Sequence, residues 1–368
     1  MPNEASRLVE GQTSAGAAIY WPALSADADQ SNAQTEMEFL ATPPHAPRQI
    51  FGDMWRIFGS GPTDPRAGAR LSQLVAQKGI PARSTLYLHS PGGSLVGGLA
   101  LGRAIRIAGL NTYIGQAGDE EIIGRFKSRK VKPGRCYSAG TLAFLGGVFR
   151  WGAEGFEYGV HRFYADRDPG SDAAQTISAM VVDYIKEMGV DPALFTEMSK
   201  AGRDEINILS EDVLTRLKVI NGASHRTVWS IESFGEGLYL KGERITWRGI
   251  NKFILLHTPK GGTILHAIFD PEGRGEEATQ MGAHSLFVDD KTHPIEASLK
   301  AHLVNGLVNI VYDLDSNLID KIKRATTVGI ALQWVYGAPM FLGFSGMEIG
   351  EGRSKLLGYL ALRDVQRQ

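Results

Sequence analysis

The sequence predicts an α/β fold in a first domain, followed by a smaller β-rich α+β domain. Between about residues 48 and 222, short apolar runs of strand length alternate with segments of helical periodicity. Strands separated by helices of this length imply βαβ crossovers and a mainly parallel sheet. After about residue 225, closely spaced strand candidates divided by turn signals take over. The 368 residues also suffice for about two domains.

The expected elements of the first domain, 48–224, follow from these periodicities. Strands are expected at 54–58, 85–89, 111–116 and 158–163. Helices are expected at 67–78, from 95 to at least 105, at 138–145 and at 176–188. The preceding residues 1–47 are rich in small and polar side chains and are expected to form a flexible arm or an extended wrap.

The second domain, 225–368, is expected to be mostly strand. Short strands are expected at 228–231, 237–240, 245–248, 253–257, 264–269 and 285–288, and helices at 316–325 and 354–365. The motifs of this domain do not indicate a chemistry.

Composition excludes several classes of function. The formal net charge is -1, so the protein has no overall positive charge that would attract it to nucleic acid or to an anionic membrane. Cys136 is the single cysteine, which precludes an intramolecular disulfide. No apolar run is long enough for a signal peptide or a membrane span. We therefore expect a soluble, cytoplasmic protein, or a periplasmic one if a signal peptide has been removed. No nucleotide, metal or haem cofactor is indicated.

The first candidate site motif is SPGGS at 90–94, which follows a buried strand and opens a helix. The pair Gly92-Gly93 allows backbone angles closed to other residues, so an N–H can point into a cleft. The N-terminus of the following helix adds partial positive charge there. Together these features suit an anionic oxygen, as in half of an oxyanion hole. The other interpretation is a tight strand-to-helix turn.

The second and third motifs supply a nucleophile and a base. In CYSAG at 136–140, Ser138 precedes an apolar helix, where it can attack a carbonyl while the Ala139 amide donates to the oxyanion. In YGVHRF at 158–163, His161 lies in an apolar strand. Each has a structural alternative, since serines often cap helices and strand histidines are often core residues. Cys136 is interpreted as a buried structural thiol.

The order and spacing of these three motifs resemble the Clp protease family, within the Clp-protease/crotonase superfamily, over roughly residues 50–222. The chain is similar in particular to a diverged group of Clp-protease-like predicted periplasmic proteins, which shares the segments EMGVDP at 187–192 and LSED at 209–212. The resemblance implies stacked βαβ units and serine peptidase chemistry. It implies Ser138 as the nucleophile, His161 as its base, and the Gly93 and Ala139 amides as oxyanion donors.

The sequence departs from this family at the residue that orients the histidine. Clp proteases have an aspartate four residues before the serine or threonine that begins the next helix. Here that serine is Ser210, and the equivalent position holds Ile206. In an extended segment Asp204 shares the side-chain direction of position 206. We therefore expect Asp204 to orient the histidine, with Glu205 or Asn207 as alternatives; the other interpretation of Asp204 is a solvated loop acid.

A second departure is the long charged segment 118–135 before the nucleophile, which contains six lysines and arginines. It is interpreted as a solvated loop. The functional alternatives are a flap over the cleft, a docking patch for an acidic partner, or the source of a lysine that replaces His161 as base, as in Ser–Lys peptidases.

Three hypotheses of function follow. The first is a serine peptidase or related acyl hydrolase that acts on a peptide or protein substrate. The second is a crotonase-type acyl-thioester enzyme, which uses a similar two-amide oxyanion hole without a serine nucleophile. The third is a binding protein on a catalytically decayed peptidase scaffold. Clp-type enzymes often form rings, so a homo-oligomer is an additional expectation from the resemblance.

Overall fold

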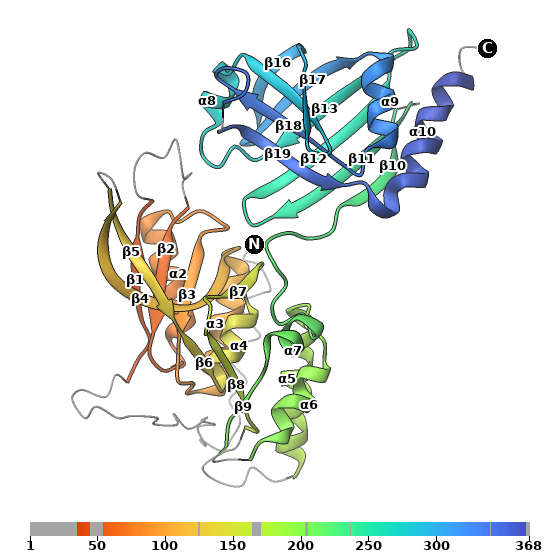
Figure 1. Ribbon diagram of the computed structural model, residues 1–368. Helices are drawn as coiled ribbons and strands as arrows, with labels where there is room; N and C mark the ends of the chain where they lie inside the picture. Colours follow the sequence, from red (N-terminus) through yellow and green to blue (C-terminus); the bar gives the residue numbers. More distant parts are fainter. Residues whose placement is uncertain are drawn as a thin grey trace, which may run out of the picture.

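The computed structural model describes residues 35–44, 54–123, 126–163, 171–202, 205–235, 237–338 and 340–365. The protein is mixed α/β (Figure 1). Its buried apolar side chains form two separate clusters. The first cluster runs from Met37 to Val219 and the second from Trp229 to Leu360. The boundary expected at 224/225 falls in the interval between them.

A six-stranded sheet forms one side of the first domain. Its central strands β2, β3, β4 and β7 are parallel, whereas β1 and β5 pair antiparallel at its two ends. Their bounds are β1 (Glu38–Thr42), β2 (Arg56–Ser60), β3 (Thr85–His89), β4 (Asn111–Ile123), β5 (Phe126–Pro133) and β7 (Arg150–Gly152). Helices α2 (Ala67–Lys78) and α3 (Leu95–Ile107) make the crossovers between the parallel strands.

A second, three-stranded sheet carries the candidate site residues. It consists of β6 (Arg135–Tyr137), β8 (Glu157–Val160) and β9 (Asn207–Ile208). A β-bridge between Ser90 and Cys136 connects this small sheet to the end of β3. The helices of this half are α4 (Ala139–Leu145), α5 (Ser171–Glu187), α6 (Ala193–Lys200) and α7 (Glu211–Arg216). Helices α3 and α4 lie between the large sheet and α5–α7 (Figure 1).

Small residues allow α3 and α4 to approach closely. A Cβ at Gly98 would lie 2.4 Å from the carbonyl oxygen of Ala139, and one at Gly102 would lie 3.0 Å from that of Leu142. Tyr184 of α5 covers this contact and donates a hydrogen bond to the Leu142 carbonyl at 2.7 Å. Because the two helices touch backbone to backbone, their relative position is tightly fixed.

Of the two alternatives for residues 1–47, a flexible arm or an extended wrap, residues 38–42 agree with the second, because they form β1. Strand β1 pairs with β2 along its whole length, and Met37 before it is buried. The Met37 amide donates to the Asp64 carboxylate at 3.1 Å, and the Met37 carbonyl accepts from Arg70 at 3.0 Å. These long-range contacts fix a segment whose local sequence has no clear periodicity. Residues 1–34 and 45–47 lie outside the described residues.

The charged segment 118–135 is largely a β-hairpin rather than a loop. Strands β4 and β5 pair antiparallel, with a register shift between Ala117 and Glu120. Opposite charges face each other across the hairpin, since Arg129 pairs with Glu120 at 2.9 Å and Lys132 with Asp119 at 3.2 Å. Cross-strand ion pairs of this kind stabilise strands that carry little apolar surface.

The second domain contains two antiparallel sheets and packed helices. The six-stranded sheet has the order β10-β11-β12-β13-β17-β16, and the four-stranded sheet has the order β15-β14-β18-β19. The strands are β10 (Val228–Phe234), β11 (Gly237–Thr246), β12 (Gly249–His257), β13 (Thr263–Phe269), β14 (Ala283–Val288), β15 (Lys291–Pro294), β16 (Ala297–Val304), β17 (Leu307–Leu314), β18 (Thr327–Gln333) and β19 (Leu342–Glu348). The helices are α8 (Gly275–Gln280), α9 (Ser316–Arg324), the short 3₁₀ helix η2 (Gly350–Gly352) and α10 (Arg353–Val365). The two strands expected at 237–240 and 245–248 belong largely to one strand, β11.

A buried arginine joins several helix ends in the first domain. Arg150 is only 2% exposed. Its Nε donates to the Val219 carbonyl at 2.8 Å, its Nη1 to that of Gly147 at 2.9 Å, and its Nη2 to that of Lys218 at 2.8 Å. These acceptors follow α4 and α7, where helices leave carbonyl groups unpaired. The guanidinium is therefore stabilised by backbone dipoles.

Among the described residues, none of the helices has the length and apolar character needed to cross a lipid bilayer.

Candidate active site

Ser138 occupies a strained backbone conformation at the junction between β6 and α4. Its φ of 56° and ψ of -127° are sparsely populated by residues other than glycine. A nucleophilic serine on a sharp strand-to-helix turn adopts such a strained geometry, which projects its hydroxyl away from the backbone. The Ser138 side chain does not cap α4, so the structural alternative of a helix-capping serine does not apply. Strain without a capping role points to a function for the side chain.

The Ser138 hydroxyl is enclosed. The residue is 1% exposed, and Oγ makes no hydrogen bond to any part of the chain that the structure describes. Gly92 lies directly against it, because a Cβ at position 92 would be 2.6 Å from the Ser138 Cβ. Gly92 also has a φ of 110°, which disfavours other residues. Two independent constraints therefore require glycine at this position.

Thr63 sets the direction of the Gly93 amide. The Thr63 amide donates to the Gly92 carbonyl at 2.6 Å, and the Thr63 carbonyl accepts from the Ser94 amide at 2.7 Å. Because successive peptide groups of an extended segment point to opposite sides, the Gly93 N–H is directed away from Thr63. Within the described residues that N–H makes no hydrogen bond. The Gly93 N–H is therefore available to an external acceptor, as an oxyanion donor must be.

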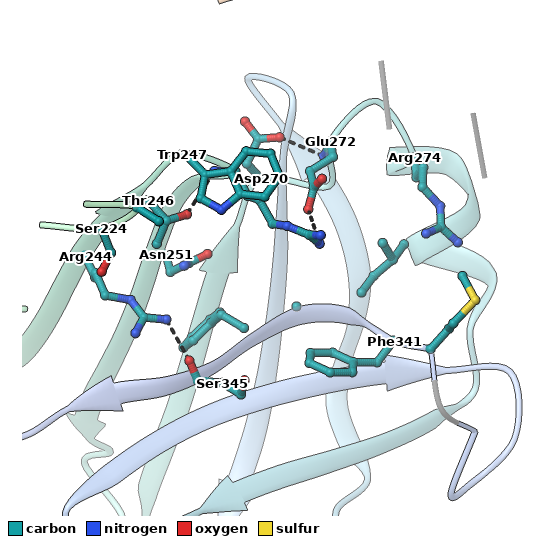
Figure 2. A pocket seen from close by; sticks show the side chains of 16 residues that line it. Ser224, Arg244, Thr246, Trp247, Asn251, Asp270, Glu272, Arg274, Phe341 and Ser345 are labelled. Atoms are coloured by element: carbon teal, nitrogen blue, oxygen red, sulfur yellow. Dashed lines mark hydrogen bonds and ion pairs between the residues drawn. The ribbon is translucent and has the colours of Figure 1, made fainter. Parts of the chain in front are cut away.

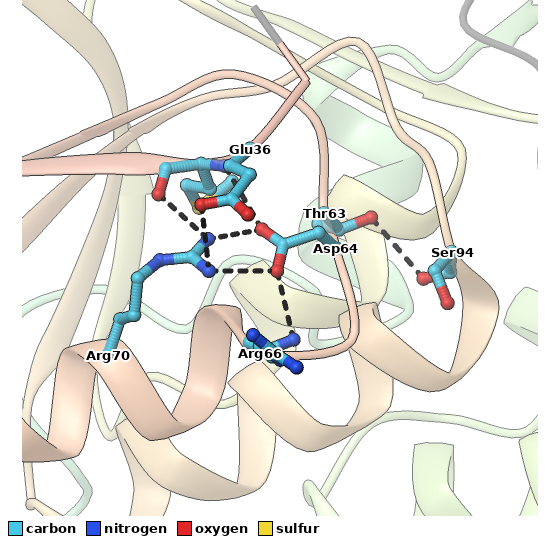
Figure 3. Close-up of polar contacts among 7 residues, drawn as sticks. Glu36, Thr63, Asp64, Arg66, Arg70 and Ser94 are labelled. Carbon is cyan, nitrogen blue, oxygen red and sulfur yellow. Dashed lines mark hydrogen bonds and ion pairs between the residues drawn. The ribbon is translucent and has the colours of Figure 1, made fainter.

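Thr63 itself is fixed by a polar network at the start of α2 (Figure 3). The carboxylate of the adjacent Asp64 accepts from the Arg66 amide at 2.9 Å and from Arg70 Nη1 at 3.0 Å. The Thr63 hydroxyl donates to the Ser94 carbonyl at 3.3 Å. The sequence carries no signature of this support, since the contacts of Thr63 to the Gly92 carbonyl and the Ser94 amide are made by its backbone atoms.

The Ala139 amide is the second predicted oxyanion donor. Ala139 is the first residue of α4, and the first amides of a helix have no acceptor within it. The α3–α4 contact brings the start of α4 beside α3, since Gly98 of α3 touches the Ala139 carbonyl. The glycine loop that opens α3 and the Ser138 turn that opens α4 are thus neighbours.

His161 follows the end of β8 and lies near Ser138 through the backbone. The β6–β8 register pairs Tyr137 with Gly159, and the Ser138 amide donates to the Gly159 carbonyl at 2.9 Å. The same register, continued by one residue, places Ser138 level with Val160, one position before His161. Ser138 Oγ and His161 Nε2 are not hydrogen-bonded to each other, because Ser138 Oγ has no hydrogen-bond partner among the described residues. Catalytic hydrogen bonds are often loose without substrate.

The backbone carbonyl of Arg162 determines the tautomer of His161. His161 Nδ1 lies 2.8 Å from that oxygen, so Nδ1 must carry a proton to make the hydrogen bond. The neutral ring then presents Nε2 with a lone pair. His161 is 0% exposed, and burial lowers the pKa of its imidazole to about 4. At neutral pH the ring is therefore uncharged and can accept a proton.

Residues 204–207 were expected to supply an acid that orients His161. The described side chains of this segment, at 205–207, do not supply such an acid. Asn207 pairs with Val160, and its amide donates to the Glu197 carbonyl at 3.2 Å, so it is engaged elsewhere. Ile206 packs against Gly159, on the face where the acid was expected. Glu205 is exposed, and Asp204 lies outside the described residues.

Cys136 is a structural thiol. It is fully buried, and its Sγ donates to the Leu88 carbonyl at 3.7 Å. Burial raises the pKa of the thiol well above its usual range, which suppresses the reactive thiolate.

No family model matches the chain, and no curated protein matches it. Among solved structures, the chain is similar to invasion associated protein b from Bartonella henselae. The match has 11% sequence identity and a TM-score of 0.28, and it covers 40% of this chain and 100% of that one. A similarity at this level carries no argument about fold or function.

Proposed function

We propose that the protein is a serine peptidase or related acyl hydrolase with Ser138 as its nucleophile. The observation that carries the proposal is the backbone of Ser138. This backbone is strained at a strand-to-helix junction. It lies beside Gly92, a position that accommodates only glycine, and next to strand β8, which leads to His161. The resemblance to Clp proteases implies the same roles for the same residues.

In this mechanism Ser138 Oγ comes within hydrogen-bond distance of His161 Nε2. The imidazole takes the hydroxyl proton as Oγ attacks the substrate carbonyl carbon. The resulting oxyanion accepts hydrogen bonds from the Gly93 and Ala139 amides. His161 then returns the proton to the leaving group as an acyl–Ser138 ester forms, and water hydrolyses that ester by the same proton transfers. The Arg162 carbonyl holds the imidazole in the required tautomer, and an orienting role for Asp204 stays a prediction.

A cavity lined in part by the two residues that follow His161 is suited to an apolar side chain of the substrate. The cavity has a volume of about 240 Å³, and Arg162 and Phe163, which directly follow His161 in the chain, line one part of it. Phe195 and Met198 of α6 form its apolar wall. We expect it to select an apolar residue next to the cleaved bond.

The enclosure of Ser138 favours one second candidate, a binding protein on a decayed peptidase scaffold. In such a protein the serine need not be reached by a substrate. Access to Oγ is therefore the property that separates the two candidates.

A fluorophosphonate probe tests this access directly. We expect the full chain to be labelled covalently, and peptide mapping by mass spectrometry to place the adduct on Ser138. Prior heat denaturation should abolish labelling, because activation depends on the folded site. A native protein that stays unlabelled at high probe concentration, or an adduct on another residue, would contradict the proposal.

The rate of labelling should also remain high down to an unusually low pH. The base must be neutral to accept the Ser138 proton, and burial lowers the pKa of His161 to about 4. The second-order labelling rate should therefore be constant from about pH 8 to about pH 5.5 and fall towards a midpoint near pH 4. A midpoint at about 6.5, the value of a solvated histidine, would show that the buried His161 is not the base.

A further inference from the structure

The second domain contains a cavity of about 600 Å³ that the hydrolase mechanism does not use (Figure 2). It lies where residues 223–224, which lead into the second domain, meet β11, β12 and β19. Its volume is within the range typical of small-molecule sites.

Arg244 is the charged lining residue of this cavity that forms no ion pair in the described part of the chain, and Glu348 attracts it only from beyond ion-pair distance. The other charges are matched in the ion pairs Arg83–Asp270 at 2.5 Å, Arg248–Glu272 at 3.4 Å and Arg274–Glu277 at 2.7 Å. Arg244 instead donates to the carbonyls of Ser345 and Gly346, at 2.7 and 2.6 Å. No carboxylate of the described residues lies within ion-pair distance of it. A guanidinium has five N–H donors, so Arg244 retains donors beyond these two bonds.

Asn251 adds a second unused donor beside this charge. Arg244 and Asn251 are direct partners in the β11–β12 register, which places both side chains on one face of the sheet. Asn251 is 8% exposed, and its amide has no hydrogen-bond partner in the described parts of the chain. Figure 2 shows Asn251 directed into the cavity next to Arg244.

The wall facing this polar pair is apolar. Met340, Phe341, Leu342 and Phe344 line it. Phe341 lies across the cavity from Arg244 in Figure 2. One end of the cavity therefore offers a single unmatched positive charge with an adjacent amide, and the other offers aromatic and aliphatic surface.

From this geometry we propose that the cavity binds a small organic monocarboxylate with an aromatic or aliphatic body. Arg244 and the Asn251 amide donate to the carboxylate, and the body packs against Phe341 and Phe344. A carboxylate in the cavity supplies the close ion-pair partner that Arg244 does not have among the described residues. The site is separate from Ser138 and does not depend on hydrolase activity.

Ligand-observed NMR titration of the full chain with 3-phenylpropionate tests the site, with 3-phenylpropionamide as the uncharged analogue. We expect the acid to bind at least tenfold more tightly than the amide. Arg244→Gln should weaken binding of the acid at least tenfold. Asn251→Leu, which keeps the charge, should weaken it several-fold, and thermal unfolding confirms that each variant is folded.

Arg226→Gln is the matched control, because Arg226 is an exposed arginine paired with the exposed Glu351. It should bind 3-phenylpropionate as the unmodified protein does. Equal binding of acid and amide would overturn the proposal. So would unchanged binding in both the Arg244 and Asn251 variants, or the absence of acid binding at millimolar concentration.

Discussion

Replacing Ser138 with alanine is expected to abolish fluorophosphonate labelling and any ester or peptide hydrolysis, while the thermal unfolding midpoint stays nearly unchanged. The variant removes the nucleophile. It should cost little stability, because Oγ does not cap α4 and makes no hydrogen bond to the described residues. Gel fluorescence and calorimetry measure the two effects.

The matched variants separate the nucleophile from its surroundings. Cys136→Ala, two residues away, should label like the unmodified protein, because the Cys136 thiol is buried and takes no part in the reaction. His161→Ala retains Ser138 and should slow labelling by about 10²–10⁴-fold, the usual contribution of a general base. Hydrolysis that persists in Ser138→Ala would assign the chemistry to another residue, and unchanged labelling in His161→Ala would remove that histidine from the mechanism.

Arg150→Met should produce the largest loss of stability. The substitution leaves several backbone carbonyls without the donor that satisfies them, and each unsatisfied buried group costs about 1–3 kcal/mol. We expect the free energy of unfolding of the first domain to fall by at least about 3 kcal/mol. A urea titration followed by circular dichroism measures this loss.

Arg103→Met is the control for Arg150. Arg103 forms an exposed ion pair with Glu187, and such pairs contribute at most about 1 kcal/mol. Its unfolding midpoint should shift only slightly. If Arg150→Met were as stable as Arg103→Met, the carbonyl contacts of Arg150 would not be important for the fold.

The elements that the sequence predicted well are those whose own periodicity is decisive. The expected helix 67–78 and strand 85–89 coincide with α2 and β3. Strand β1 and the β4–β5 hairpin were missed because they depend on distant partners and cross-strand charges rather than on a local pattern. Strands β15–β19 were also missed. Strands β15 and β16 are mostly exposed and mix polar with apolar residues, whereas β17 and β18 are buried apolar runs that the pattern could have indicated.

The candidate site divides in the same way. Ser138 and Gly92 stand in recognisable motifs, and the structure places them against each other. The groups that support the site could not be found from side-chain types, because Thr63 and Arg162 act through backbone atoms. Asp204, expected from alternation along a strand, lies outside the described residues, so its role stays a prediction. The described contact that fixes the tautomer of His161 comes from the next peptide group.

Arg150 also has a consequence for the order in which the chain folds as it is made. Its Nε and Nη2 bind carbonyls 69 and 68 residues further along the chain. Until the ribosome has released that later segment, the guanidinium lacks the acceptors Val219 and Lys218. We therefore expect α4 not to reach its final packed position before then. Contacts of such sequence separation form late. The turn that contains Ser138 should therefore reach its strained geometry only after the whole first domain has emerged from the ribosome. Before that point, Ser138 of the nascent chain would not be an activated nucleophile.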